Sequence, residues 1–233
     1  MASSNKSRAV FITGGGSGLG AATAQYLSEL GWRIGLCARR NEALQTVSAR
    51  LKQPAQLYAL DVANAEALDE AILDFEPDAL VCCAAILGQG SVYDELTPQK
   101  FAAVHAINVA GTFHACRSAM RLWQSRGIAG DIVNLSSLGG IRGMQKFPGF
   151  AAYASSKHAI VGLTEALAIE GKAHNIRVNA VAPGTLRTPM IGALGIFPAT
   201  TPESITGTME FLLDRQRSGP ITGTTIEIHC NDD

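Results

Sequence analysis

A tyrosine and a lysine in the second half of the chain have the types and spacing of a proton-transfer pair. Tyr153 and Lys157 lie four positions apart in the run AAYASSKHA, residues 151–159. Residues four apart in a helix share one face, so the Lys157 ammonium would lie beside the Tyr153 phenol. A free phenol has a pKa of about 10, and a nearby positive charge favours phenolate and lowers that pKa. The pair therefore predicts a general acid and base; the alternative is a packed tyrosine with this spacing by coincidence.

Two polar residues elsewhere would complete such a site. Ser137 ends the run DIVNLSS, so a strand end would present its hydroxyl to a substrate carbonyl oxygen while negative charge develops there. Ser136 should face the other way along the strand and is predicted to be structural. Asn108, in HAINVAG, falls inside a predicted helix, where propensity does not favour a carboxamide. It either belongs to the site or hydrogen-bonds a helix backbone carbonyl.

A glycine cluster joins the first apolar run of the chain to the first helical one. Gly14, Gly18 and Gly20, in VFITGGGSGLG, would let the backbone turn tightly and approach a pyrophosphate at the positive N-terminal end of a helix. Ser17 and Leu19 lie in the same loop and are assigned to cofactor binding with them. A flexible turn is the alternative, but the position after the first strand and before a helix is what a dinucleotide fingerprint needs.

The second apolar run ends in GLCARRN, where a dinucleotide site contacts the adenosine ribose. An NAD site would normally place Asp or Glu here, but this chain has Ala38 followed by Arg39 and Arg40. A carboxylate would repel a 2'-phosphate, whereas a guanidinium pairs with it. The chain therefore favours NADP(H), with Arg39 as first contact and Arg40 in support, and NAD as the other possibility. Alternatively, both arginines are solvated charges before a helix capped by Asn41.

The third apolar run ends with a carboxylate. Asp61, in LDV, is placed to accept a hydrogen bond from the adenine amino group, and Val62 is assigned to the same site. Asp61 would serve equally well as the cap of the next helix, and spacing does not separate these two roles.

The elements that must position these residues alternate along the chain. Short apolar runs predict strands at residues 9–13, 33–38, 56–62, 79–85, 131–137, 176–182 and 224–230. Helical patterns lie between them at residues 17–31, 41–52, 64–75, 97–126 and 152–173. Continuous apolar strands joined by helical crossovers predict a Rossmann-type, doubly wound α/β fold, in which helices cover both faces of a parallel sheet in three layers. Ligands of such sheets bind beyond the carboxyl ends of the strands.

Composition narrows the class of partner. The 233 residues are 47% hydrophobic with a formal net charge of −1, which suits a single domain over residues 1–233 with a substantial core. No dense block of Lys and Arg indicates nucleic acid or an anionic membrane, so a small molecule is the expected partner. The apolar stretch near the N-terminus is too short for a signal peptide or membrane span, which predicts a cytoplasmic protein. Neither the five cysteines nor the five histidines have ligand spacing, so no bound metal is predicted.

Together these motifs resemble the short-chain dehydrogenases/reductases, in their single-domain branch. TGGGSGLG, LDV, IN before VAG, NLSSLGG, YASSK and IRVNAVAPG occur in that family's order between residues 8 and 230. Each is weak alone, and the ordered set is highly specific. The resemblance implies a seven-stranded parallel sheet, an adenine contact at Asp61, and catalytic positions at Asn108, Ser137, Tyr153 and Lys157.

The resemblance also implies roles that residue types alone do not. In that family the lysine bonds the nicotinamide ribose, and the asparagine helps to hold a water that relays protons toward it. Pro183 and Gly184 resemble the turn that shapes the nicotinamide pocket, with Thr188 placed to bind the carboxamide. The helices at residues 108–126 and 153–173 commonly form a subunit interface, so a homodimer or homotetramer is expected.

Three departures from the family pattern concern the site. CCAA at residues 82–85 stands where Asn-Asn-Ala-Gly is usual, which puts the bracing role of that strand end in doubt. RGMQKFPGF, residues 142–150, adds a few residues between Ser137 and Tyr153, in a loop expected to line the pocket. The segment after Thr188 is short, which predicts a reduced lid and an open pocket.

The residues predict an oxidoreductase that interconverts a ketone and a secondary alcohol with NADP(H). Ser137 would hold the carbonyl oxygen, Tyr153 would transfer the proton, and Lys157 would keep the tyrosine poised. The segments expected to line the pocket are mostly apolar, which favours a ketone with hydrophobic substituents. These segments are residues 87–93, 138–150 and 186–197.

Two alternatives stay open. A 3-oxoacyl thioester reductase would need a basic patch for its carrier-protein partner, and Arg121, Arg126 and Arg142 are the candidates, although scattered arginines are more often solvated charges. A non-enzymatic NADP(H)-binding sensor would keep the fold, but it would have no need to retain the serine, tyrosine and lysine together.

Overall fold

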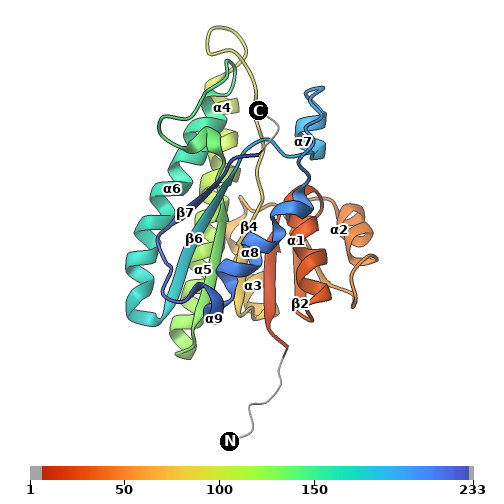
Figure 1. Ribbon diagram of the computed structural model, residues 1–233, viewed down its shortest axis with the longest axis vertical. Coiled ribbons are helices and arrows are strands. Elements are labelled where there is room, and N and C mark those ends of the chain that lie inside the picture. Colours follow the sequence, from red (N-terminus) through yellow and green to blue (C-terminus); the bar gives the residue numbers. More distant parts are fainter. Residues whose placement is uncertain (1–6, 231–233) are drawn as a thin grey trace, which may run out of the picture.

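The computed structural model of the protein describes residues 7–230, which form a seven-stranded sheet with every neighbouring pair parallel (Figure 1). The strand order is β3-β2-β1-β4-β5-β6-β7, which confirms the doubly wound prediction. The strands are β1 (Ala9–Thr13), β2 (Arg33–Ala38), β3 (Gln56–Ala59), β4 (Ala79–Cys82), β5 (Gly130–Leu135), β6 (Ile176–Pro183) and β7 (Thr225–Ile228).

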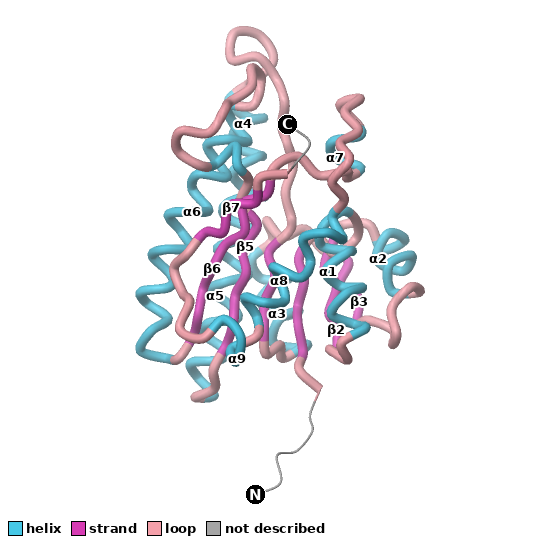
Figure 2. The backbone as a smooth tube through the Cα atoms, in the orientation of Figure 1, coloured by secondary structure: helices cyan, strands magenta, loops and turns pink. Residues whose placement is uncertain are grey.

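Helices cover both faces of this sheet, as Figure 2 shows. One face packs against α1 (Gly18–Glu29), α2 (Asn41–Ser48) and α8 (Thr206–Leu213). The other packs against α3 (Ala65–Phe75), α5 (Gly111–Arg126) and α6 (Ala151–Gly171). Because both faces are covered, the central strands β1, β4 and β6 are buried along their whole length, and this requires their nearly continuous apolar sequences. The other α-helices of the described residues are α4 (Pro98–His105), α7 (Pro189–Gly192) and α9 (Arg215–Ser218).

The strand order reverses between β1 and β4, and this reversal places the site. β2 and β3 extend the sheet on one side, and β5, β6 and β7 extend it on the other. The loops after β1 and β4 therefore diverge at their carboxyl ends, which is where a doubly wound sheet leaves a crevice for a ligand. In Figure 1 this edge faces upward, with the loop between β4 and α4 at the top of the molecule.

Several predicted boundaries differ from the observed ones for local reasons. β3 ends at Ala59, and the Asp61 carboxylate then accepts a hydrogen bond from the Ala63 backbone N–H at 3.0 Å in the turn that follows. The cap of α3 is Asn64, which accepts from the Ala67 N–H at 3.2 Å, so Asp61 does not cap this helix. Asn41 does not cap α2 either, because it is the first residue inside that helix.

The long helix predicted over residues 97–126 is divided. A π-helical turn, Ala106–Ala110, joins α4 to α5, and it contains Asn108. Such turns are rare and occur often at functional sites. No helix within residues 7–230 has both the length and the apolar run that a bilayer span requires.

Candidate active site

The glycine loop after β1 has the shape that a phosphate cradle needs. Gly14 has φ +68°, and a Cβ at this position would lie 2.6 Å from the Ala84 backbone nitrogen. A Cβ at Gly20 would lie 2.5 Å from the Gly14 carbonyl oxygen. α1 then begins at Gly18, and the Ser17 side chain makes no capping hydrogen bond to it. The N–H groups of the first turn are therefore available to an anion at the positive end of the helix.

Replacing Gly14 by alanine should weaken NADPH binding by at least about tenfold, because the added methyl overlaps the backbone of residue 84 and the left-handed φ is strained. Cofactor fluorescence titration measures the affinity. Gly31 is a matched control, since it has φ +84° with nothing within 4 Å of an added Cβ. Gly31→Ala should cost about 1 kcal/mol of unfolding free energy and leave cofactor affinity unchanged. Equal affinity losses in both variants would contradict the cradle assignment.

The other residues assigned to this loop contribute in different ways. The Leu19 side chain is buried in the core beneath α1, so only its backbone can reach a ligand. Thr188 approaches the loop from the other side of the crevice, because a Cβ at Gly18 would lie 3.3 Å from the Thr188 Cγ2. The Thr188 hydroxyl also accepts a hydrogen bond from the Ile191 N–H at 3.4 Å, as the cap of α7.

Arg39 and Arg40 lie next to the glycine loop at the end of β2. The Gly15 N–H donates to the Cys37 carbonyl at 3.1 Å, which holds the loop against this strand end. Both arginines are exposed, and neither forms a salt bridge with any residue of the described chain. Two guanidinium groups beside the loop are therefore available to an anionic group.

Asp61 and Val62 lie at the end of the neighbouring β3. One carboxylate oxygen of Asp61 takes part in the turn described above. The Val62 side chain is buried beneath the start of α5, where a Cβ at Gly111 would lie 2.5 Å from its Cγ2. Val62 can therefore contact a cofactor only through its backbone.

Helix α6 carries Tyr153 and Lys157, and the loop after β5 brings Ser137 to them. A Cβ at Gly140 would lie 2.5 Å from the Lys157 backbone carbon, so this glycine permits close packing of the loop on α6. The Ser137 hydroxyl acts on the Tyr153 phenol as a hydrogen-bond partner and lowers its pKa. Ser136 instead donates to the Lys157 carbonyl at 2.9 Å, which confirms its structural role.

Lys157 lies near the tyrosine but is held by the strand. Its Nζ is 5.7 Å from the centroid of the Tyr153 ring and donates to the Leu135 carbonyl at 2.6 Å. Burial lowers the pKa of Lys157 to about 8, an effect that Cys83 and Cys82 partly oppose. Burial raises the pKa of Tyr153, opposed by Ser137 and not by the lysine. The prediction that Lys157 depresses the tyrosine pKa is therefore wrong for the chain by itself: burial outweighs the hydrogen bond, and the ammonium is directed to a backbone carbonyl.

These pKa directions predict how carbonyl reduction depends on pH. The raised pKa of Tyr153 keeps its phenol protonated at neutral pH, whereas Lys157 loses its cation as pH rises through about 8. The value of kcat/KM for NADPH, which reports on the free enzyme, should be flat near pH 7 and fall above pH 8. Initial rates at low NADPH measure this profile. A Lys157→Arg variant, whose guanidinium does not titrate, should not show the fall in kcat/KM above pH 8. A wild-type profile that stays flat to pH 10 would contradict the assignment of this fall to Lys157.

The same lowered pKa of Lys157 has a consequence for stability. An unfolded lysine stays protonated to about pH 10.4, so between about pH 8 and that value the unfolded chain binds more protons than the folded one. The cost of burying the cation is present in full below pH 8. It is relieved as pH rises, so this group adds stability in the alkaline range.

Asn108 connects the loop after β4 to α6. Its amide nitrogen donates to the Ile86 carbonyl at 3.0 Å and to the Ser156 hydroxyl at 2.9 Å, and its amide oxygen accepts from the Ile86 N–H at 2.8 Å. The partner carbonyl lies outside the helix of Asn108, in contrast to the predicted alternative. This buried side chain positions the backbone around the site.

The turn after β6 packs against the last strand. Pro183 is the final residue of β6, and the Gly184 N–H donates to the Ile228 carbonyl at 2.9 Å. The segment that follows includes α7, which is a single turn. Within this segment the Arg187 backbone N–H donates to the Thr200 carbonyl at 2.9 Å, and the Arg187 Nε donates to the Pro198 carbonyl at 2.8 Å. The reduction of the lid relative to the family pattern stays a prediction.

The CCAA strand end is braced by Thr13 in place of asparagine side chains. The Thr13 carbonyl accepts from the Cys83 N–H at 3.1 Å, and its hydroxyl accepts from the Ala84 N–H at 3.4 Å. Burial raises the pKa of the Cys83 thiol to about 12, against the opposing charge of Lys157, so the thiol is neutral at pH 7. The sequence identified Cys83 only as part of a buried strand, although its place directly after β4, at the reversal of strand order, indicates contact with the site.

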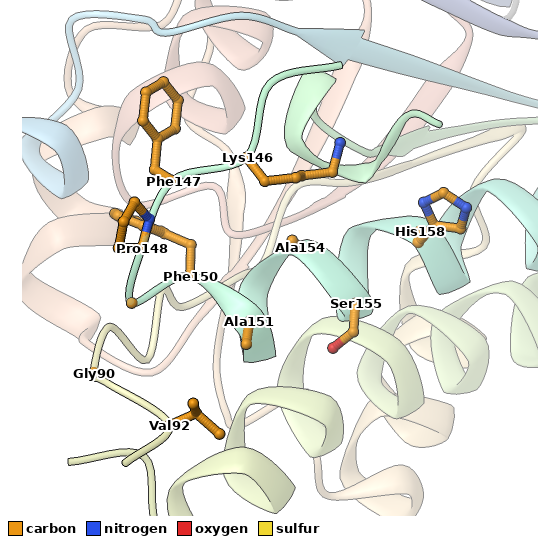
Figure 3. A pocket seen from close by; sticks show the side chains of 11 residues that line it. Gly90, Val92, Lys146, Phe147, Pro148, Phe150, Ala151, Ala154, Ser155 and His158 are labelled. Atoms are coloured by element: carbon orange, nitrogen blue, oxygen red, sulfur yellow. The ribbon is translucent and has the colours of Figure 1, made fainter. Parts of the chain in front are cut away.

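The added residues between Ser137 and α6 form a cavity of about 400 Å³ with the loop after β4 (Figure 3). Its walls include Gly90, Val92, Phe147, Ala151, Ala154 and His158. The last three recur at helical spacing on a face of α6 different from that of Tyr153 and Lys157. Two of the three segments expected to line one pocket contribute to this cavity, and residues 186–197 do not. The cavity is therefore separate from the four candidate catalytic side chains.

Comparisons with known proteins identify the family to which this chain belongs. Residues 8–196 match the family model for short chain dehydrogenase. Levodione reductase of Leifsonia aquatica is 34% identical over 194 residues, covering 79% of this chain and 71% of the relative. A crystal structure of levodione reductase superimposes with a TM-score of 0.86 at 28% identity over 95% of both chains.

Two further relatives cover nearly the whole chain. The 3-oxoacyl acyl-carrier-protein reductase of Rickettsia bellii is 29% identical over 230 residues, covering 94% of this chain and 93% of the relative. A xylitol dehydrogenase solved with NAD+ bound is 31% identical, with a TM-score of 0.82, over 95% of this chain and 97% of the other. With its fold, its glycine loop and its family match, the chain belongs to the short-chain dehydrogenase/reductase family, whose enzymes are oxidoreductases that use NAD(H) or NADP(H).

Proposed function

We propose that this protein is an NADP(H)-dependent reductase that interconverts a ketone and a secondary alcohol. The observation that carries the proposal is the meeting of Ser137, Tyr153 and Lys157 at the carboxyl edge of the sheet, beside a glycine loop in which Gly14 and Gly20 leave no room for side chains. A protein that only sensed the cofactor would need the glycine loop but not the three side chains.

The residues at the crevice fit a phosphorylated dinucleotide. The open first turn of α1 and the close-packed glycines suit the pyrophosphate, and Arg39 with Arg40 suits a 2'-phosphate. When bound, the cofactor supplies the hydride. The NAD+-bound xylitol dehydrogenase shows that a related chain uses the non-phosphorylated form, so the preference for NADP(H) rests on the two arginines.

The chain's own residues would supply proton transfer and charge stabilisation. Ser137 donates a hydrogen bond to the carbonyl oxygen, and Tyr153 gives its phenolic proton to that oxygen as negative charge develops. Lys157, whose Nζ lies 5.7 Å from the centroid of the Tyr153 ring, would counter the negative charge of the phenolate left behind only if cofactor and substrate draw its ammonium away from the Leu135 carbonyl. Because the pKa of Tyr153 is raised, the phenol is in its acid form at neutral pH, as a proton donor to the carbonyl oxygen requires.

A ketone is a better substrate than an acyl group on a carrier protein. The basic patch expected for a carrier would need Arg121, Arg126 and Arg142 together, but Arg126 ends α5 and pairs with Glu76, which argues against it. Arg142 lies in the loop after β5, at the opposite edge of the sheet. Because one relative is a 3-oxoacyl acyl-carrier-protein reductase, a thioester should be among the compounds tested.

A substrate panel tests this proposal directly. NADPH oxidation should be measured with ketones of increasing apolar bulk, with a 3-oxoacyl thioester, and again with NADH. We expect turnover of an apolar ketone with NADPH and little with the thioester. Preferred turnover of the thioester would replace the ketone assignment, and NADPH binding without turnover across the panel would favour a sensor.

We also propose a homodimer or homotetramer assembled through α5 and α6. These helices expose Phe113 and Ile169, large apolar side chains that a partner subunit would cover.

A further inference from the structure

Three arginines share one buried carboxylate at the edge of the sheet opposite to the active site. Asp131, in β5, accepts hydrogen bonds from Arg8 at 3.1 Å, from Arg177 at 2.8 Å and from Arg215 at 3.0 Å. The Asp131 side chain is 3% exposed and that of Arg177 is 8% exposed, whereas those of Arg8 and Arg215 are 39% and 30% exposed. The cluster joins β5 and β6 to α9, at the lower end of Figure 1.

The charges of this cluster do not balance. One carboxylate faces three guanidinium groups, which leaves a net charge of +2 in a partly buried region. Asp78 and Asp214 lie at the same edge but accept from the backbone N–H groups of Ala9 and Gln216, and neither forms an ion pair within residues 7–230. The strongly buried Arg177 is paired with Asp131, so the excess positive charge lies on the partly exposed Arg8 and Arg215, where it attracts an anion to this edge of the sheet.

A cavity of about 280 Å³ adjoins the cluster where such an anion would fit. Its walls include Lys172, Asn175, Arg177 and Arg215, together with the backbone at Gly219, and none of its lining residues is acidic. It lies between the turn that follows α6 and the loop that follows α9, so two segments far apart in sequence form it.

Hydrogen-bond donors remain available in this cavity. An arginine has five N–H donors, and Arg177 and Arg215 each use four, which leaves one on each. The Asn175 amide oxygen accepts from Arg215 at 2.7 Å, and its amide nitrogen has no partner in the described chain. The Lys172 ammonium likewise has no hydrogen-bond partner among residues 7–230.

We propose that this cavity is a binding site for a phosphate group, either inorganic phosphate or the phosphate of a small monoester. Phosphate carries nearly two negative charges at neutral pH and offers several strong acceptor oxygens, which match the excess charge and the unused donors. A bound phosphate would connect the turn after α6 to the loop after α9. It would stabilise the fold and leave turnover unchanged, because the cavity lies at the edge of the sheet away from Tyr153.

Calorimetric titration of the NADP-saturated protein with inorganic phosphate tests the proposal, at ionic strength held constant with chloride. Saturation with cofactor keeps phosphate out of the glycine loop. We expect saturable binding and a rise in thermal midpoint that follows site occupancy. Lys172→Glu, which removes a donor and reverses an exposed charge without touching the Asp131 network, should weaken binding by about tenfold or more. Lys52→Glu, an equal charge change at an exposed position outside the cavity, should not.

The result that overturns the proposal is absence of saturable binding, or equal affinity in wild type and Lys172→Glu. A second titration with glycerol 3-phosphate separates the two sources of the phosphate group, since tighter binding than inorganic phosphate would assign a monoester. These outcomes do not depend on carbonyl reduction. A protein that fails to turn over ketones can still bind phosphate here, and the titration can be repeated without cofactor.

Discussion

Tyr153→Phe should lose most of its turnover while it binds NADPH almost as tightly as the wild type. The substitution removes one hydroxyl and keeps the ring, so packing on α6 is preserved and only the proton donor is lost. A positioned general acid typically contributes about 10²–10⁴-fold to the rate, and kcat for ketone reduction should fall within or beyond this range. Steady-state kinetics give kcat, and cofactor fluorescence gives the affinity for NADPH.

Tyr58→Phe is the matched control for this experiment. Tyr58 lies in β3, and its hydroxyl donates to Asp74 at 2.7 Å. The same chemical change therefore occurs away from the catalytic residues. It should leave kcat near the wild-type value. Wild-type turnover in Tyr153→Phe would refute the proposed mechanism, and an equal loss in both variants would point to a general effect on the fold.

Arg39→Asp should reverse the preference for the two nicotinamide cofactors. The substitution removes a guanidinium that we assign to the 2'-phosphate and adds a carboxylate that repels this phosphate but can accept from the ribose hydroxyl of NADH. A lost charge-assisted contact and a new repulsion together should lower kcat/KM for NADPH by about a hundredfold, with a gain for NADH. Parallel rate measurements with the two cofactors at one ketone concentration show the effect.

Arg50→Asp provides the same charge change at an exposed position beyond the end of α2. It should leave the ratio of the two cofactors unaltered. The assignment of Arg39 fails if the wild type already prefers NADH strongly, or if Arg39→Asp and Arg50→Asp behave alike.

The order of elements was predictable because periodicity and burial are repeated along the whole chain. β1, β4 and β6 read as continuous apolar runs because helices cover both of their faces, and the glycine loop followed from its place after the first strand. Local hydrogen bonds were harder to predict. Asp61 and Asn64 are both good capping residues within one turn, and only the backbone path after β3 decides that Asn64 caps α3.

Contacts between distant segments could not be read from the sequence. The spacing of Tyr153 and Lys157 places them on one helix, but it does not reveal the Leu135 carbonyl that holds the lysine, or the burial that raises the pKa of the phenol. The same limit applies to the Ile86 backbone that Asn108 binds. Arg126 likewise pairs with a glutamate fifty positions away, which removes it from the expected basic patch.

The hydrogen bonds of Asn108 make one wall of the active-site crevice more rigid than the other. If the loop after β4 moved away from the π-helical turn, it would break both bonds between Asn108 and the Ile86 backbone and leave buried polar atoms without partners, at a cost of about 1–3 kcal/mol for each atom. The wall formed by this loop is therefore stiff. Any widening of the crevice to admit a bulky ketone falls to the opposite wall, the single turn of α7 and the residues after it.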